Sequence, residues 1–319
     1  MGLKARKVII IGAGHVGSHA GYALASQGLA EKIVYIDTDE DKAKAQALDI
    51  FDATVYLPRR VEVKAGDYSE AKDGDLMIIA VGPLPDMTKG QTRMDTLSDT
   101  IEIIKDVVVK IKESGFSGII LSISNPADVV AHYIQKKLDY PPHKIISTST
   151  TLDSARLRRV ISDHTGIDQK SIYAYALGEH GESQMVAWST VTIAGKPIIE
   201  LIKEKPDKYG RLDLEAMAAE GRAGGWKILG GKGSTEFGIG ASIAEVTRAI
   251  FADEKRVLPV SVLLQGEYGQ DDVYASVPTV LGIKGVEEII ELSMTEEEQA
   301  AFNASCKTLK ENYQIALRL

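Results

Sequence analysis

Short runs of β-branched and other apolar residues alternate with stretches of helical periodicity through the first half of the chain. Six such runs predict strands, at residues 8–11, 33–36, 61–63, 76–81, 119–123 and 144–146. Strands that alternate with helices form parallel βαβ units, and strands that are apolar almost throughout belong to a sheet covered on both faces. The pattern therefore predicts an α/β fold with a doubly wound parallel sheet over residues 1–150.

The pattern changes after about residue 150. Longer helical stretches follow, together with two strand-rich segments at residues 172–199 and 257–280 that have glycine turns between them. We therefore expect a second, mixed α+β domain over residues 151–319. Near the end of the chain, residues 295–298 form a capping-box pattern ahead of an amphipathic helix.

Composition and charge narrow the possible partners. No apolar run approaches the ~20 residues needed to cross a bilayer, and we expect no signal peptide, no membrane partner and a cytoplasmic location. The net charge of −8, without a basic run, disfavours nucleic acid. The single cysteine, Cys306, shares helical spacing with Phe302, Leu309 and Tyr313, so it is expected in the core. No His, Cys or carboxylate group has metal-ligand spacing, and no metal is expected.

A glycine-rich segment follows the first predicted strand. It reads Gly12-Ala13-Gly14-His15-Val16-Gly17 and opens a helix of small residues. Bare backbone there lets a pyrophosphate approach the free N–H groups at the helix N-terminus. Asp37 closes the second strand, where a carboxylate accepts hydrogen bonds from a ribose and repels a 2′-phosphate. The motif predicts a Rossmann-type site for NAD rather than NADP; the alternative is a glycine turn without a ligand.

Three further segments carry candidate catalytic side chains. A loop rich in proline and glycine follows the fourth strand, is placed to cover a ligand and ends at Arg93. Asp153 and Arg156 have the i, i+3 spacing of one helix face. His180 stands between glycines in GEHG, and an imidazole exchanges protons near neutral pH. Taken singly, these are also compatible with a surface arginine, a surface ion pair and a structural histidine.

Taken together, the ordered motifs GAGHVG, SNPAD, LDSAR, GEHG and KGST resemble the L-lactate and L-malate dehydrogenase family over essentially the whole chain. The resemblance implies an NAD-dependent L-2-hydroxyacid dehydrogenase that transfers hydride to a 2-oxo acid. It also implies a homo-oligomer, with a tetramer expected.

The resemblance assigns roles to individual residues. It implies that His180 gives and takes the proton, that Asp153 orients His180, and that Arg93 polarises the 2-oxo group. The substrate-binding residues it implies are Arg156, Asn125, Thr235 and Met87. The cofactor-binding residues are Gly12, Gly14, Val16, Gly17, Asp37, Tyr68, Gly82, Ile123 and Asn125.

Two departures from the lactate dehydrogenase pattern bear on the substrate. Met87 stands where lactate dehydrogenases carry glutamine and malate dehydrogenases carry arginine, so a second substrate carboxylate would be unpaired. Gly224-Gly225 replaces two alanines beside the pocket. Both changes favour a wider, more apolar pocket, and residues 112–116 and 187–190 also resemble L-2-hydroxyisocaproate dehydrogenase. The prediction is a broad-range enzyme that prefers bulky aliphatic 2-oxo acids.

The sequence leaves two alternatives open. One is an L-lactate dehydrogenase with pyruvate as its main substrate. The other is a non-catalytic NAD sensor, which would not need Arg93, Asp153, Arg156 and His180 together. Arg158 matches one residue of the fructose 1,6-bisphosphate site of activated bacterial lactate dehydrogenases, but Tyr173 stands where a histidine would be. We therefore expect weak or absent activation by this sugar.

Overall fold

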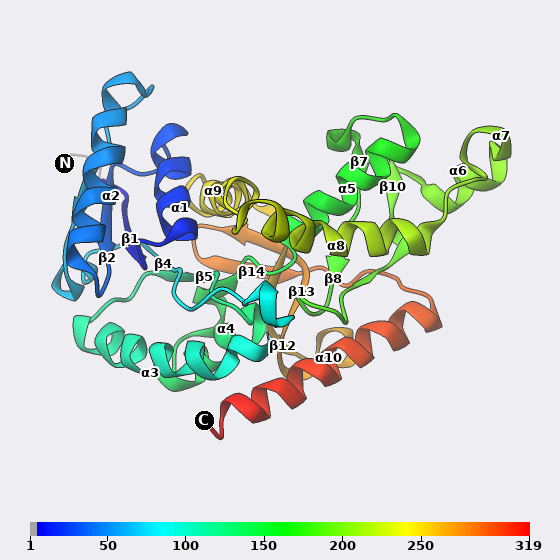
Figure 1. The fold of residues 1–319 in the computed structure, drawn as a ribbon. Coiled ribbons are helices and arrows are strands. Elements are labelled where there is room, and N and C mark those ends of the chain that lie inside the picture. Colours follow the sequence, from blue (N-terminus) through cyan, green and yellow to red (C-terminus); the bar gives the residue numbers. More distant parts are fainter. Residues whose placement is uncertain (1–4, 93) are drawn as a thin grey trace.

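The computed structural model describes residues 5–92 and 94–319. Its main feature is one sheet with the strand order β14-β13-β12-β6-β5-β4-β1-β2-β3 (Figure 1). The strands from β3 to β6 in this order are parallel. They are β1 (Lys7–Ile11), β2 (Lys32–Ile36), β3 (Glu62–Ala65), β4 (Leu76–Ile79), β5 (Ile119–Ser122) and β6 (Ile145–Ser147). All six predicted strands are present, with bounds that differ by a residue or two.

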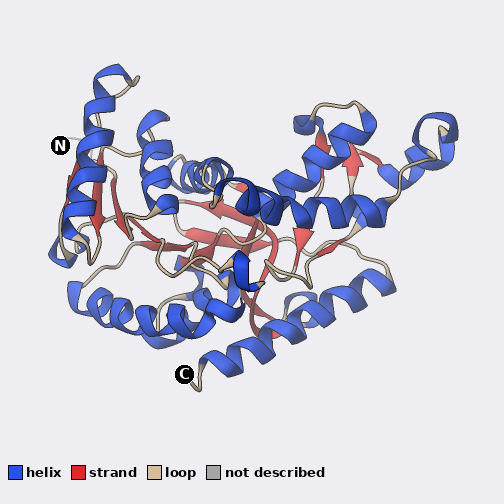
Figure 2. Ribbon diagram, in the orientation of Figure 1, coloured by secondary structure: helices blue, strands red, loops and turns tan. Residues whose placement is uncertain are grey.

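Helices cover both faces of the sheet (Figure 1; Figure 2). One face carries α1 (His15–Ser26), α2 (Glu40–Ala53) and α9 (Phe237–Phe251), and the other carries α3 (Leu97–Ser114), α4 (Ala127–Leu138) and α10 (Glu296–Ala316). Every residue of β1, β4 and β5 is buried, as a strand between two helical layers requires. The predicted α/β doubly wound fold is confirmed.

The second half of the chain extends the same sheet. Strands β12 (Arg256–Gln265), β13 (Asp271–Gly282) and β14 (Gly285–Ile289) form an antiparallel meander. Strand β12 pairs with β6 at Ser261 and Ser147, so the meander continues the parallel sheet. The sequence predicted strands here but did not indicate this continuity.

A smaller unit with its own apolar core lies beside the sheet. Its helices are α5 (Thr151–Thr165), α6 (Ile198–Glu204), α7 (Pro206–Tyr209) and α8 (Leu214–Lys232), with a small sheet of β7 (Ile172–Tyr173), β10 (Thr192–Ile193) and β11 (Lys196–Pro197). Leu157, Trp188 and Met217 belong to its core. A hairpin of β8 (Ala176–Leu177) and β9 (Met185–Val186) connects it to the main sheet.

Helix α10 begins with the predicted capping box, in which Thr295 and Glu298 exchange hydrogen bonds with each other's backbone. Cys306 is a free, fully buried thiol on this helix, as expected, and burial raises its pKa to about 12. Over residues 5–92 and 94–319, no helix is long and apolar enough to cross a membrane.

Candidate active site

The glycine-rich turn has the geometry of a phosphate-binding turn. Gly12 has φ +99°, and a side chain on it would collide with the Ala80 carbonyl of the adjacent strand. A side chain on Gly17 would collide with the carbonyl of Gly12, so this glycine allows α1 to pack closely. Gly14 precedes α1, has no side-chain cap and faces open space. The N-terminus of α1 is therefore free to receive an anion.

Asp37 lies beside this turn at the end of β2. Its carboxylate accepts hydrogen bonds from the backbone N–H groups of Ala13, at 2.6 Å, and Asp39, at 2.9 Å. A groove of 670 Å³ opens here, large enough for part of a dinucleotide. Five of the predicted cofactor residues line it: Gly12, Gly14, Asp37, Tyr68 and Gly82.

His180, Asp153 and Arg156 form one buried polar group. His180 Nδ1 donates to Asp153 Oδ2, and Arg156 Nη1 donates to Asp153 Oδ1 at 2.7 Å. The side chains of Asp153 and Arg156 are only 3% and 8% exposed, so they are not a surface pair. Because Nδ1 of His180 is engaged, Nε2 is the ring nitrogen left to exchange a proton with a ligand.

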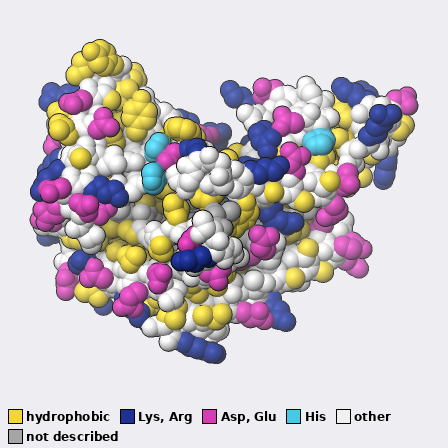
Figure 3. Space-filling model, viewed as in Figure 1, with side chains coloured by type: hydrophobic (Ala, Val, Ile, Leu, Met, Phe, Trp, Pro, Cys, Tyr) yellow, Lys and Arg dark blue, Asp and Glu magenta, His cyan; other side chains and the backbone are white. Residues whose placement is uncertain are grey.

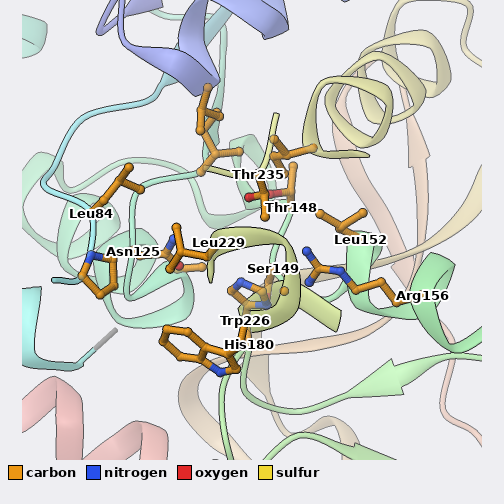
Figure 4. A pocket seen from close by; sticks show the side chains of 16 residues that line it. Leu84, Asn125, Thr148, Ser149, Leu152, Arg156, His180, Trp226, Leu229 and Thr235 are labelled. Atoms are coloured by element: carbon orange, nitrogen blue, oxygen red, sulfur yellow. The ribbon is translucent and has the colours of Figure 1, made fainter. Parts of the chain in front are cut away.

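A second, smaller pocket of 90 Å³ brings together side chains that are distant in sequence (Figure 4). The predicted residues that line it are Val16, Ile123, Asn125, Arg156, His180 and Thr235. The side-chain oxygen of Asn125 is buried and has no hydrogen-bond partner among the residues that the structure describes, which makes it available to a bound molecule. The pocket and the groove share this end of the parallel sheet, where ligands of such folds bind.

Two predicted residues cannot be placed here. Arg93 lies outside the described residues. Met87 begins a short 3-10 turn, Met87–Lys89, but its side chain also lies outside what the structure describes. Their proposed roles remain predictions.

Gly224 and Gly225 of α8 lie against a side chain that the sequence analysis did not indicate. A β-carbon on Gly225 would lie 3.1 Å from Arg156 Nη1, and one on Gly224 would lie 3.4 Å from Arg156 Cδ. The side chain of Arg156 therefore packs against both glycines, and Gly225 also lines the small pocket. The interpretation that these glycines widen the pocket stays a prediction.

The sequence reasoning missed several residues of the site. Ser149, Leu152, Trp226 and Leu229 also line the small pocket (Figure 4). Asp128 is buried and accepts a hydrogen bond from the backbone N–H of His180, at 2.8 Å. Asp128 belongs to the SNPAD motif, so the motif itself was the signal that could have drawn attention to it.

The arrangement fits a nicotinamide dinucleotide. The open helix N-terminus suits a pyrophosphate, Asp37 suits ribose hydroxyls and the unpartnered Asn125 oxygen lies in the adjoining pocket. Among the described residues, no group of three or more His, Cys, Asp or Glu side chains could hold a metal ion.

Comparison with known proteins agrees with this geometry. The NAD-binding domain of lactate/malate dehydrogenases matches residues 6–147, and the α/β C-terminal domain of the same enzymes matches residues 150–318. L-lactate dehydrogenase 3 of Bacillus cereus is 42% identical over 306 residues, which cover 96% of each chain. L-lactate dehydrogenase of Fusobacterium nucleatum is 39% identical over 98% of each chain.

Solved structures show the same relationship. The minor L-lactate dehydrogenase from Enterococcus mundtii, in a ligand-bound form, superposes with a TM-score of 0.93 at 37% identity and covers 98% of each chain. The lactate dehydrogenase MGS-M5, from a deep-sea metagenome library, has a TM-score of 0.93 at 38% identity, over 98% of this chain and 99% of that one.

Proposed function

Because this chain belongs to the lactate/malate dehydrogenase family and is an NAD-dependent oxidoreductase that acts on a CH–OH group, we propose that it interconverts pyruvate and L-lactate. The observation that carries the proposal is the buried Asp153–His180 pair beside Arg156, in a small pocket that adjoins a dinucleotide groove.

Each residue of the site has a separate role in the proposed reaction. Bound NADH supplies the hydride. Nε2 of His180 donates a proton to the carbonyl oxygen of the 2-oxo acid, and Asp153 holds the ring in place through Nδ1. The N–H groups of Arg156 that do not bind Asp153 hold the substrate carboxylate. Arg93 is proposed to stabilise the negative charge that develops on the carbonyl oxygen.

Asn125 and Thr235 complete the proposed contacts. The Asn125 oxygen has no partner in the described part of the chain and accepts from a hydroxyl of the bound molecules. Thr235 lies on the α8–α9 connection at the pocket wall. We propose that residues 1–150 bind the cofactor and residues 151–319 bind the substrate, with Asn125 reaching the substrate from the first part.

Pyruvate is the substrate that the observations favour. The relatives described above are named lactate or L-lactate dehydrogenases. The preference for bulky aliphatic acids, predicted from Met87 and Gly224-Gly225, has no support in these findings.

Self-association is part of the proposal. Apolar side chains are exposed on α2 and on the following 3-10 turn, Thr54–Tyr56, and Figure 3 shows hydrophobic side chains gathered over this end of α2. These side chains, which we call the α2 patch, are Leu48, Phe51, Val55 and Tyr56. A second copy of the chain is the partner we propose for it.

We also propose that the protein works in the cytoplasm and that sugar bisphosphate does not activate it. Arg158 is half-buried, stacks over Tyr175 and donates to the carbonyl of Ala174, and burial lowers its pKa. Tyr173, which is exposed beside it, adds no positive charge to pair with a phosphate.

The test is a comparison of kcat/KM for NADH oxidation with pyruvate, 4-methyl-2-oxopentanoate and oxaloacetate. We expect pyruvate to exceed both other acids by at least about tenfold, a discrimination that about 1.4 kcal/mol supplies. A preference for 4-methyl-2-oxopentanoate would restore the bulky-substrate prediction. Absence of turnover with any 2-oxo acid would overturn the proposed function.

A further inference from the structure

A carboxylate joins the glycine-rich turn to the connection between α8 and α9. Glu236 directly precedes α9, and its Oε1 lies 2.9 Å from Nδ1 of His15, the first residue of α1. The side chain of Glu236 is 14% exposed, whereas that of His15 is 68% exposed. The contact therefore lies at the edge of the site and links two segments that are far apart in the sequence.

Each partner is the covalent neighbour of a residue that lines the small pocket. Val16 comes directly after His15, and its side chain lines the pocket. Thr235 comes directly before Glu236 and lines the same pocket (Figure 4). A residue that shifts carries its neighbour with it, because consecutive Cα atoms are held ~3.8 Å apart. The contact thus fixes two parts of the pocket wall relative to each other.

Two nearby groups hold the Glu236 carboxylate in one orientation. Its Oε2 accepts a hydrogen bond from Nζ of Lys232, and its Oε1 accepts one from Ser234 Oγ at 2.7 Å. These bonds lower the pKa of Glu236 to about 2, so the group is ionised at neutral pH. Lys232 and Ser234 belong to the same segment as Glu236, so they orient the carboxylate but do not connect it to α1. The contact with His15 makes that connection.

Further along, α1 and α9 pack through ring and backbone contacts. His19 meets the ring of Phe237 edge-on, with 5.3 Å between the centroids. A β-carbon on Gly240 of α9 would lie 3.2 Å from the carbonyl oxygen of His19. The helices are thus held together beyond the pocket, whereas the contact between His15 and Glu236 lies where the pocket wall begins.

We propose that Glu236 is a positioning residue, which holds Thr235 at the pocket wall through its contact with His15. The inference rests on the proposed function, in which the small pocket receives pyruvate. The contact sets where the α8–α9 connection sits on α1, and with it the distance between Val16 and Thr235. Its loss should weaken substrate binding more than it slows the reaction, because the proposed proton donor, His180, is held by other elements.

Variants of His15 test this role from the exposed end of the contact. His15→Ala removes the contact, whereas His15→Asn keeps an N–H donor close to the position of Nδ1. The probe is oxamate, an unreactive analogue of pyruvate, whose binding to the enzyme saturated with NADH is followed by quenching of NADH fluorescence. We expect His15→Ala to raise the Kd for oxamate and the KM for pyruvate by about three- to tenfold, and His15→Asn to raise them by less than about twofold. Both kcat and the Kd for NADH should stay within about threefold of the unaltered enzyme.

A second substitution shows whether the two residues act together. Glu236→Ala removes the carboxylate with all its contacts and should raise the Kd for oxamate at least as much as His15→Ala does. Adding His15→Ala to Glu236→Ala should then raise it no further.

The matched control is His164→Ala. Nε2 of His164 lies 3.3 Å from Glu220 Oε2, in a comparable pair between α5 and α8, and neither residue lines the described wall of the small pocket. We expect this variant to leave the Kd for oxamate within about twofold of the value for the unaltered enzyme.

The outcomes separate this inference from the proposed function. If the unaltered enzyme with NADH neither binds oxamate nor reduces pyruvate, both proposals fail. If it does both, and His15→Ala leaves the Kd for oxamate within about twofold, Glu236 does not position the pocket wall through His15. The same conclusion follows if the effects of His15→Ala and Glu236→Ala multiply in the double variant, or if His15→Ala lowers kcat while the Kd for oxamate is unchanged.

Discussion

Arg156 shows how the backbone of one helix makes room for a side chain of another. The guanidinium from α5 lies against Gly225 of α8, where a β-carbon would be 3.1 Å from Nη1. It is fixed from the other side by Asp153. The position of Arg156, which is proposed to hold the substrate carboxylate, therefore depends on a residue that has no side chain.

The variant Gly225→Ala should displace Arg156 by a few tenths of an ångström. We expect KM to rise two- to fivefold, roughly equally for pyruvate and 4-methyl-2-oxopentanoate, because both substrates present the same carboxylate. Gly230→Ala on the same helix is the control, since nothing lies within 4 Å of its new β-carbon. A selective loss of activity on the branched acid would instead show that Gly225 sets the pocket width.

His132 should make the protein sensitive to acid. Its ring is buried and stacks on Tyr313 with 3.6 Å between centroids, and burial lowers its pKa from 6.5 to about 4. Between these two values the unfolded chain binds a proton that the folded protein does not. The free energy of unfolding therefore falls as the pH drops through this window, by about 3 kcal/mol in total.

The variant His132→Phe keeps the stacked ring and removes the titration. When urea unfolding is measured at several pH values between about 7 and 4, the variant should lose less stability as the pH falls than the unaltered protein does. His143→Gln, which replaces an exposed histidine, is expected to leave the loss of stability over this pH range unchanged. Identical slopes for His132→Phe and the unaltered protein would contradict this account.

At the residue scale, the sequence identified His180, Asp153 and Arg156 as candidates because family motifs surround each of them. It did not single out Asp128, because its hydrogen bond with the His180 N–H forms only when the His180 loop, 52 residues further along, folds back onto α4. It did not indicate that Gly225 lies against Arg156, because the neighbour of this glycine is fixed by the packing of α5 on α8. The spacing of residues along the sequence does not predict contacts of this kind.

At the scale of elements, helix α10 helps to hold the His180 loop in position. Ser305 accepts from the Glu179 N–H, and it packs so closely that a side chain on Gly178 would collide with it. Gly178 also has φ +81° and pairs with Ser276 of β13. The loop is thus held between α10 and the sheet.

The variant Gly178→Ala should therefore lose more stability than the strain of the left-handed backbone conformation alone would remove. Gly195→Ala is the matched control, because Gly195 has φ +80° but nothing within 4 Å of the new β-carbon. We expect the control to lose about 1–2 kcal/mol in urea unfolding and Gly178→Ala to lose at least as much again, together with kcat. Equal losses in both variants would show that Ser305 does not press on the loop.

The elements of the first half were predictable because their strands are buried on both faces and are apolar almost throughout. The strand-rich segment predicted at residues 172–199 contains the two-residue strands β7 to β11, but their separate bounds and pairing were not predicted, since these depend on partners elsewhere in the fold. Helix α10 was predictable from its capping box, but its contact with Glu179 was not.

At the scale of the whole molecule, one sheet joins the two halves of the chain. The pairing of Ser147 with Ser261 links the parallel strands to the meander of β12 to β14, and this continuity could not be predicted from local pattern. The groove and the pocket meet at the carboxyl end of the parallel strands, which the motif positions did predict.

The α2 patch should bring two copies of the chain together. Sedimentation velocity is expected to show a species heavier than the 34.5 kDa monomer, and Tyr56→Asp, which places a charge on a side chain that is 91% exposed, should shift it toward the monomer. Ile283→Asp, at an exposed residue remote from the patch in sequence, serves as the control. A monomer in the unaltered protein would refute the proposed self-association.

The central claim is that His180 is the acid and base for hydride transfer in a pocket beside bound NADH. The variant His180→Asn tests it most directly, with NADH binding followed by fluorescence and pyruvate reduction followed in the same samples. We expect kcat to fall by about a hundredfold or more while the Kd for NADH stays within about threefold, because the proton donor is lost and the groove is untouched. A kcat within tenfold of the unaltered enzyme would contradict the account.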